Sequence, residues 1–257
     1  MKKAITVLKR PQLKNPVFVA AWPGMGNVAL KAALFLREKL KAEEFAVFHP
    51  DSFFQPSGID IYDKIITTTQ LPEGRFYFYK NALRKHDIII FISEAQPLFE
   101  KSYEYAKQIV DFIKELQVRM VFTFAALPSP IEHTKSPLVW ASATHKSLLE
   151  QLGKIPVKIM SNGQISGLNG LLLGVAKEAG IPGVCLLGEI PLYTIQIENP
   201  LASLAVLDAL SKLIPLRIDC SELEGHARVI REEIEKLIDF LKDPESHHSP
   251  IGLEEIE

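Results

Sequence analysis

The sequence predicts an α/β protein with a mostly parallel sheet, and three observations lead to this prediction. Short β-prone apolar runs alternate with amphipathic stretches along the 257 residues. Residues 17–21 and 88–92 are continuously apolar, which is typical of strands covered by helices on both faces. Hydrophobic residues make up 47% and charged residues 23% of the chain, as in ordinary folded domains. We expect one α/β domain over residues 1–242 and a disordered acidic tail over residues 243–257.

The individual elements follow from the same patterns and their turn residues. Strands are expected at residues 17–21, 45–48, 59–67, 76–79, 88–92, 120–125, 138–141 and 184–187. Helices are expected at residues 27–40, 103–116, 168–178, 201–213 and 221–242. We expect Asn27 to be the N-cap of the first helix, and the strands at 45–48, 59–67 and 76–79 to form an antiparallel flank.

Charge, cysteine spacing and the length of the apolar stretches indicate the compartment and exclude nucleic acid and membranes as partners. The formal net charge is −2, so the chain lacks the basic surface that binding to a nucleic-acid backbone requires. Cys185 and Cys220 have neither metal-site nor redox spacing, which indicates a reducing compartment. No stretch has the length of a membrane span. We therefore expect a cytoplasmic protein that binds neither nucleic acid nor membranes.

A glycine-rich loop follows the first buried strand. Gly24 and Gly26 begin a G-x-G-x-x-A pattern that leads into a helix. The pattern leaves three interpretations open. The glycines can serve a tight turn, the helix N-terminus can hold a small anion, or the loop can bind a dinucleotide with Asp51 as the ribose acid.

Two carboxylates are expected at the carboxyl ends of strands, where ligands of open parallel sheets bind. Glu94 follows the strand at 88–92, and Glu189 follows the strand at 184–187. If both face one crevice, they can form an acid/base pair with separated pKa values. Alternatively, each caps a helix N-terminus or pairs with a basic neighbour.

A second glycine-rich run spans residues 163–170, so two such loops can face one crevice. The candidate ligand crevice consists of Trp22, Gly24, Gly26, Asn27, Glu94, Gln96, Gly167, Asn169 and Glu189. The sequence has no P-loop lysine, no G-x-S-x-G elbow and no H-E-x-x-H helix. We therefore assign no catalytic residue, no metal site and no cofactor.

The last expected helix carries an apolar seam with spacings of four and three residues. The seam consists of Leu223, Ala227, Ile230, Ile234, Leu237 and Leu241. A repeat of 3.5 residues is typical of helices that pair with another helix. The seam therefore indicates either docking onto the protein's own sheet or pairing with another subunit.

Several of these segments together resemble the proteasome-assembly-chaperone-two family of archaea, bacteria and eukaryotes. The resemblance rests on residues 22–28 (WPGMGNV), 163–174, 179–182 (AGIP) and 185–191 (CLLGEIP), and it extends over roughly residues 16–242. It implies a three-layer α/β fold of the nucleoside-phosphorylase or hydrolase-like type with C-terminal helices. It also implies a homo-oligomer without established catalysis.

The resemblance makes a non-catalytic, oligomeric chaperone-like or scaffolding protein the leading hypothesis, with proteasome-like subunits as partners of the folded body. The alternative is an enzyme or binder for a phosphate- or carboxylate-bearing small molecule, in the manner of an ATP-dependent ligase. The chain departs from the family pattern at Ala125-Ala126, where two glycines are common, and at Ile190-Pro191-Leu192, which replaces Thr-Pro-Gly. Both departures argue against a shared small-molecule site.

The C-terminus is a third departure. Archaeal relatives that engage the proteasome are expected to end in a hydrophobic residue, tyrosine and any residue, whereas this chain ends in Glu255-Ile256-Glu257. Neither the tyrosine hydroxyl nor the preceding apolar contact is available. We therefore expect no tail-dependent binding to proteasome α-subunits.

Overall fold

The centre of the molecule is a parallel block of four strands. The computed structural model describes residues 4–49, 52–56, 58–82 and 85–242. The block has the order β7 (Ile88–Ser93), β2 (Val17–Ala21), β8 (Met120–Ser129) and β11 (Gly183–Pro191). Every residue of β2, β7 and β11 is buried, as continuously apolar strands require. The sequence-based prediction of a buried parallel core is confirmed.

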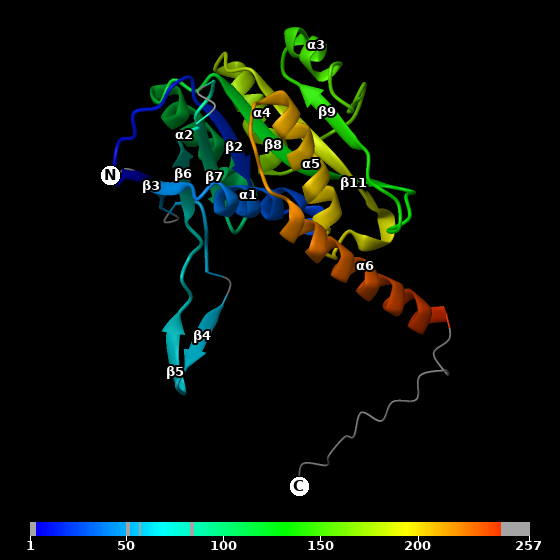
Figure 1. Cartoon of the computed structure of the whole chain (residues 1–257). Coiled ribbons are helices and arrows are strands. Elements are labelled where there is room, and N and C mark those ends of the chain that lie inside the picture. Colours follow the sequence, from blue (N-terminus) through cyan, green and yellow to red (C-terminus); the bar gives the residue numbers. More distant parts are fainter. Residues whose placement is uncertain (1–3, 50–51, 57, 83–84, 243–257) are drawn as a thin grey trace.

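Antiparallel strands extend this block into a sheet of nine strands (Figure 1). On one side lie β6 (Gly74–Tyr79), β3 (Glu43–Phe48) and β1 (Ile5–Val7). On the other side β9 (Val139–Ala143) pairs antiparallel with β11, and β10 (Lys158–Ile159) pairs parallel with β9. Four parallel strands thus occupy the centre of a mixed sheet, and one further parallel pair, β9 with β10, lies at its edge.

Helices cover both faces and complete three layers. Helices α1 (Val28–Lys39) and α5 (Pro200–Leu213) contact each other on one face, and α2 (Ser102–Glu115) and α4 (Leu168–Glu178) on the other. The core is divided accordingly: alternate residues of β2 belong to the two apolar clusters on either side of the sheet. A single turn of helix, α3 (Leu149–Leu152), precedes β10. The three-layer arrangement agrees with the expectation from the sequence.

The last helix, α6 (Ser221–Lys242), packs by its first half against α5. Its last turns extend beyond the body of the molecule (Figure 1). Residues 243–257, including the expected disordered tail, lie outside the described residues.

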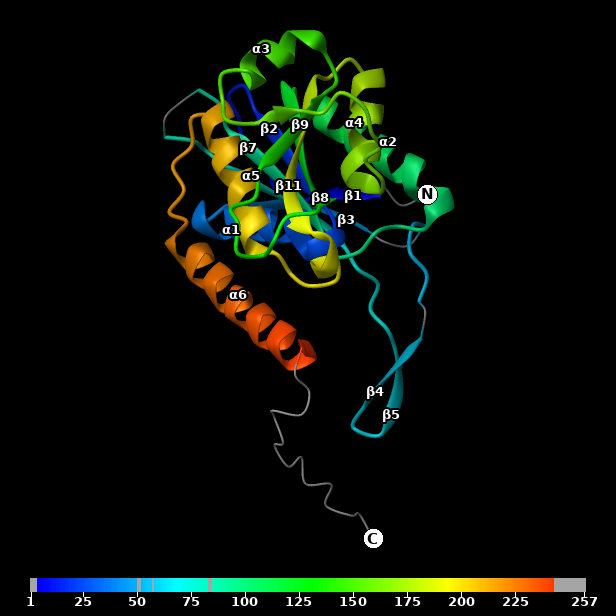
Figure 2. The same ribbon diagram turned by 90° about the vertical axis from the view of Figure 1, so that its right-hand side faces the viewer.

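The predicted single strand at residues 59–67 is wrong, because this segment is a hairpin of two strands. Strands β4 (Ile59–Tyr62) and β5 (Ile65–Thr68) form a separate two-stranded sheet. Asp63 and Lys64 form the turn between them with φ angles of 48° and 64°. The predicted antiparallel flank therefore contains β3 and β6 but not this segment, which projects away from the body (Figures 1 and 2).

Strands β8 and β11 continue further than predicted. They pair with each other as far as Ser129 and Pro191, whereas β2 pairs with β8 only up to Thr123. Beyond Thr123, β8 is no longer paired with β2, so Pro128 can follow without removing a hydrogen bond to that strand. The consequence is that Glu189 lies within β11 and not after it.

Candidate functional site

The glycine loop after β2 is hydrogen-bonded to the segment that follows β11. Gly26 has a φ of 60°, and a Cβ atom at this position would lie 3.3 Å from Cβ of Asn199. The Gly26 amide donates to the carbonyl of Ile195 at 2.8 Å, and the Asn199 amide donates to the carbonyl of Gly26 at 2.8 Å. The loop is therefore a tight turn with close backbone approach, which is one of the three interpretations of the sequence.

Asn27 does not cap the first helix with its side chain. Helix α1 begins at Val28, and Asn27 precedes it in the left-handed conformation with a φ of 48°. Its side chain makes no capping hydrogen bond. Asn27 thus occupies the expected N-cap position, but it has left-handed rather than the extended backbone angles usual for a capping residue. The ribose acid considered for this loop, Asp51, lies outside the described residues.

Trp22 and Asn169 connect the end of β2 to the first turn of α4. The backbone N–H of Trp22 donates to Oδ1 of Asn169 at 3.2 Å, and Nδ2 of Asn169 donates to the carbonyl of Trp22 at 3.2 Å. Both residues are buried, with Trp22 fully so. The two ends of the Asn169 amide thus satisfy both backbone groups of one buried residue.

Gln96 makes a second connection between the same segments. Its Nε2 donates to the carbonyl of Pro23 at 2.7 Å, and its Oε1 accepts from the backbone N–H of Leu168 at 3.1 Å. Gly167 allows this approach, because a Cβ atom there would lie 3.1 Å from Nε2 of Gln96. The N-terminal amide of α4 that an anion would need is therefore bonded to a side chain of the protein.

The structure brings together five of the nine predicted crevice residues. We call this group the strand-end cluster: Trp22, Gly24, Gln96, Gly167 and Asn169. A Cβ atom on Gly24 would lie 3.8 Å from Nδ2 of Asn169, so this glycine also faces the amide. The Asn169 and Gln96 amides of the cluster bond to the backbone of Trp22, Pro23 and Leu168, which makes it a link between three chain segments.

The two candidate carboxylates lie in different hollows. Glu189 is buried and accepts hydrogen bonds from Nε1 of Trp140 at 2.9 Å and from the backbone N–H of Leu138 at 3.2 Å. It lines a small hollow of about 30 Å³ beneath residues of α6. Glu94 is exposed and lines a separate hollow of about 700 Å³. The structure therefore does not bring them together as an acid/base pair.

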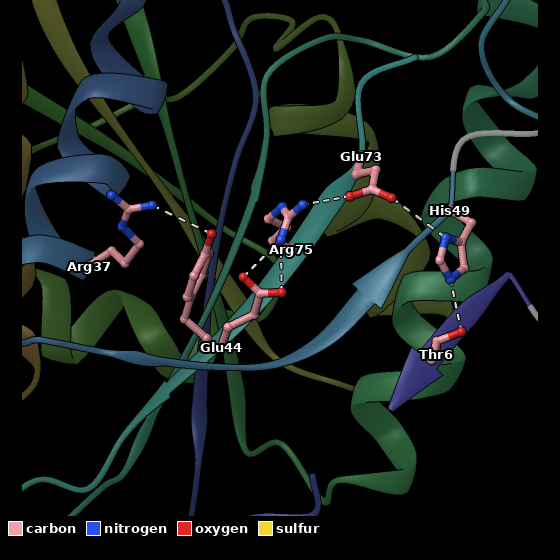
Figure 3. Close-up of polar contacts among 7 residues, drawn as sticks. Thr6, Arg37, Glu44, His49, Glu73 and Arg75 are labelled. Atoms are coloured by element: carbon pink, nitrogen blue, oxygen red, sulfur yellow. Dashed lines mark hydrogen bonds and ion pairs between the residues drawn. The ribbon is translucent and has the colours of Figure 1, made fainter. Parts of the chain in front are cut away.

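A charged network missed by the sequence analysis crosses strands β6, β3 and β1 (Figure 3). Nη1 of Arg75 binds both carboxylate oxygens of Glu44 at 2.9 and 3.0 Å, and Nη2 binds Glu73 at 2.7 Å. The other oxygen of Glu73 lies 3.7 Å from Nδ1 of His49, whose Nε2 lies 2.8 Å from Oγ1 of Thr6. The hydrogen bond with Glu44 raises the pKa of Arg75, which keeps the guanidinium charged. The alternating polar positions of residues 73–77 were the available sequence signal.

The larger hollow is lined by Glu73 and Arg75 of this network and carries charges of both signs. Arg37 also lines it, and its Nη1 lies 3.5 Å from the hydroxyl of Tyr77. The guanidinium sits over the Tyr77 ring, 5.3 Å from its centroid. Because two arginines and two glutamates, Glu73 and Glu94, line it together, the hollow is not a selective anion site.

The seam of α6 divides into a covered half and an exposed half. Leu223, Ala227 and Ile234 are buried, and Ile230 is partly buried against the body of the protein. Leu237 and Leu241 are 49% and 68% exposed. We call the exposed part, residues 237–241, the α6 overhang. The first part of the seam thus packs on its own chain, whereas the last two apolar residues of the seam are exposed.

The described residues offer little metal or thiol chemistry. They contain no group of three His, Cys, Asp or Glu side chains that could hold a metal ion. Burial raises the pKa of the Cys185 thiol to about 12, so it stays protonated near neutral pH and is a poor nucleophile. Within the same residues, no helix combines the length and the apolar character of a membrane span.

Comparisons with known proteins give one consistent result. The sequence profile of the PAC2 family matches residues 18–238. An uncharacterised protein of Methanocaldococcus jannaschii is 30% identical over 233 residues, which cover 89% of this chain and 85% of that protein. Pyrococcus furiosus PbaB, described as an archaeal proteasome activator, aligns with a TM-score of 0.79 and 31% identity over 92% of this chain and 99% of PbaB. Pyrococcus furiosus PbaA, described as an archaeal homolog of proteasome-assembly chaperone, aligns with a TM-score of 0.72 and 26% identity over 94% of each chain.

Proposed function

Because the chain belongs to the PAC2 family, we propose that it is a non-catalytic, oligomeric chaperone-like protein that binds proteasome-related subunits through its folded body. The observation that carries the proposal is the strand-end cluster. In open α/β sheets this edge ordinarily holds substrates. Here the amide groups of Asn169 and Gln96 bond to backbone groups of the protein itself, as in the pair formed by Trp22 and Asn169.

The energetics of the cluster support a structural role. Leaving a buried donor or acceptor without a partner costs about 1–3 kcal/mol. A ligand that displaced Asn169 from Trp22 would therefore have to satisfy two buried backbone groups in its place. Glu189 is held in the same way by Trp140 and a backbone amide, beneath α6.

The partner class follows from the likeness to PbaB and PbaA. PbaB is described as a proteasome activator, and PbaA as a homolog of a proteasome-assembly chaperone. Each aligns over more than nine tenths of this chain, so the likeness concerns the whole folded body. We therefore propose a partner related to proteasome subunits.

The α6 overhang supports the oligomeric part of the proposal. Leu237 and Leu241 continue the seam at its spacing, yet both are exposed in the single chain. Burying an apolar side chain of this size contributes about 1.5–3 kcal/mol. We propose that the overhang packs against another subunit, while Leu223 to Ile234 hold the helix on its own body.

The C-terminal tripeptide 255–257 lies outside the described residues, and the expectation for it stays a proposal. Its sequence lacks the hydrophobic residue and the tyrosine that the family resemblance implies. Binding through the folded body should then survive removal of the tail.

A pull-down with purified proteasome α-subunits of the host tests the partner. The full chain and a version truncated after Lys242 should both retain the subunits. Loss of binding in the truncated version alone would move the contact to the tail, and retention by neither would contradict the proposed partner. A thermal-shift panel of nucleotides and sugar phosphates tests the alternative function, because a ligand at 100 times its Kd stabilises a protein by about 2.7 kcal/mol.

A further inference from the structure

The hairpin of β4 and β5 is the most exposed apolar element of the described structure. All eight strand residues are exposed. Its large apolar side chains are Ile59, Ile61, Tyr62, Ile65 and Ile66, which are 56–79% exposed. An isolated two-stranded hairpin is marginally stable in water and ordinarily needs a third strand or a packed face. The hairpin therefore lacks, within a single chain, the contacts that such an element requires.

Its register defines what each face carries. Ile61 lies opposite Ile66, and Ile59 opposite Thr68, so these four residues share one face. The other face carries Asp60 opposite Thr67 and Tyr62 opposite Ile65. The tip carries apolar side chains on both faces. Contact with a flat surface would therefore cover the apolar side chains of one face only.

The turn defines which backbone groups point outward. Two central residues with positive φ form a type I′ turn, and the residues flanking such a turn make a hydrogen-bonded pair. Tyr62 and Ile65 are therefore bonded to each other, and hydrogen-bonded and open pairs alternate from there. The N–H and C=O groups of Ile66 and Thr68 consequently point to the free edge of β5.

The free edge of β5 lacks the features that ordinarily block edge pairing. Residues 65–71 (IITTTQL) contain no charged residue and no proline. Edge strands are protected from pairing by charges, prolines or bulges, and an uncharged β-branched segment is instead prone to self-pairing. The edge of β4 differs, because Asp60 occupies the position that Thr67 occupies in β5.

We propose that β5 pairs antiparallel with β5 of a second copy of this chain, forming a four-stranded sheet across a two-fold axis. With the axis at Thr67, the outward groups of Ile66 in each copy bond to those of Thr68 in the other. Thr67 then faces its own symmetry mate. The equivalent pairing through β4 would place Asp60 opposite Asp60, where like charges destabilise a cross-strand pair.

The second copy is favoured as the occupant because the segment matches itself. Pairing about Thr67 sets each isoleucine at position 66 opposite a threonine and brings no two like charges together. The contact is small compared with the roughly 1,600 Å² of a standard interface. It therefore adds to a larger contact between the copies, and it deepens the oligomeric part of the proposed function.

Disulfide trapping tests this pairing with a matched control. Two Cα atoms in an open antiparallel pair are about 4.5 Å apart, within the range that a disulfide spans. In a Cys220→Ser background, Thr67→Cys should convert most of the chain to a linked dimer under mild oxidation. Asp60→Cys, on the same rung but the opposite edge, should stay unlinked. Adding Thr68→Pro to Thr67→Cys should abolish linkage, because it removes an outward N–H without touching the bonds inside the hairpin.

Each outcome decides the proposal. Linkage of Asp60→Cys to the same extent as Thr67→Cys would overturn the pairing through β5. Linkage of Thr67→Cys that persists when Thr68→Pro is added would overturn it as well. No linkage of Thr67→Cys in a chain that light scattering still finds oligomeric would also overturn it, while leaving the α6 overhang as the contact. A monomer mass without linkage would contradict both the pairing and the oligomer of the proposed function.

Discussion

The strand-end cluster and the hairpin differ in how many contacts their residues make within one chain. In the cluster, Asn169 and Gln96 bond to backbone groups that lie 72 to 147 positions away in the sequence. In the hairpin, every strand residue is exposed and one strand edge is free of charge. The difference teaches where this protein can contact others: the side-chain amides of the cluster are bonded within the chain and are not available to a ligand, whereas the apolar side chains of the hairpin are exposed.

The largest effect on stability is expected from Ile234→Asp in α6, at a side chain that is covered by its own chain. Ile234 is 6% exposed, so the substitution removes buried apolar contacts and places a carboxylate among them. We expect a loss of about 3–5 kcal/mol in the free energy of unfolding, measured by urea denaturation. Leu237→Asp is the matched control on the same seam and should change the stability of the monomer, measured at low protein concentration, little, because Leu237 is exposed in the single chain. Equal losses in both variants would contradict the division of the seam.

The next effect concerns the cluster itself. Asn169→Ala leaves the N–H and C=O of Trp22 buried without their partner, which should lower the free energy of unfolding by about 2–3 kcal/mol. Asn162→Ala, in the exposed loop before α4, serves as the control. If Asn169→Ala were as stable as the control, the pairing at the strand ends would not be a stabilising link.

A smaller effect is expected in the glycine turn. Gly26→Val forces a β-branched residue to a φ of 60° and into contact with Asn199, which should cost about 1–3 kcal/mol. Gly174→Ala in α4 is the opposite case, since a Cβ atom there meets no atom within 4 Å. It should stabilise the protein by about 0.5–1 kcal/mol through its higher helix propensity. Thermal melts of the two variants that shifted in the same direction would contradict this account.

The smallest effect on stability is expected in the hairpin. Ile61→Lys alters an exposed side chain, so the free energy of unfolding should change by less than about 0.5 kcal/mol. The same change should lower the mass measured by light scattering if the hairpin contacts a second copy. A clear loss of stability in a monomeric preparation would mean that the hairpin is packed within its own chain.

The sequence predicted the interior better than the surface, and the reason is physical. Buried strands such as residues 17–21 and 88–92 must be continuously apolar, and helix α4 was predicted at its observed bounds of 168–178. The hairpin was missed because its turn contains Asp63 and Lys64 and no glycine, although both have positive φ. The β-branched residues of the segment 59–67 therefore predicted one continuous strand.

The candidate site was predicted in part. The rule that ligands bind beyond strand ends led to Trp22 and Gln96, and the second glycine-rich run led to Asn169; the three residues do lie together. The rule gave no indication that these groups would bond to one another, because that depends on distances between distant segments. Glu189 was misplaced because β11 continues through Gly188 while paired with β8, and no local signal marks that extension.

The strand-end cluster also has a consequence for the order of folding. Trp22 and Asn169 are separated by 147 positions, and Gln96 by about half that distance from each of its partners. Contacts between such distant positions require closure of long loops, so they form after local helices and neighbouring strands. Weakening the cluster should then mainly accelerate unfolding and leave the folding rate nearly unchanged. The cluster would thus determine how long the folded chain persists, and the apolar strands how fast it forms.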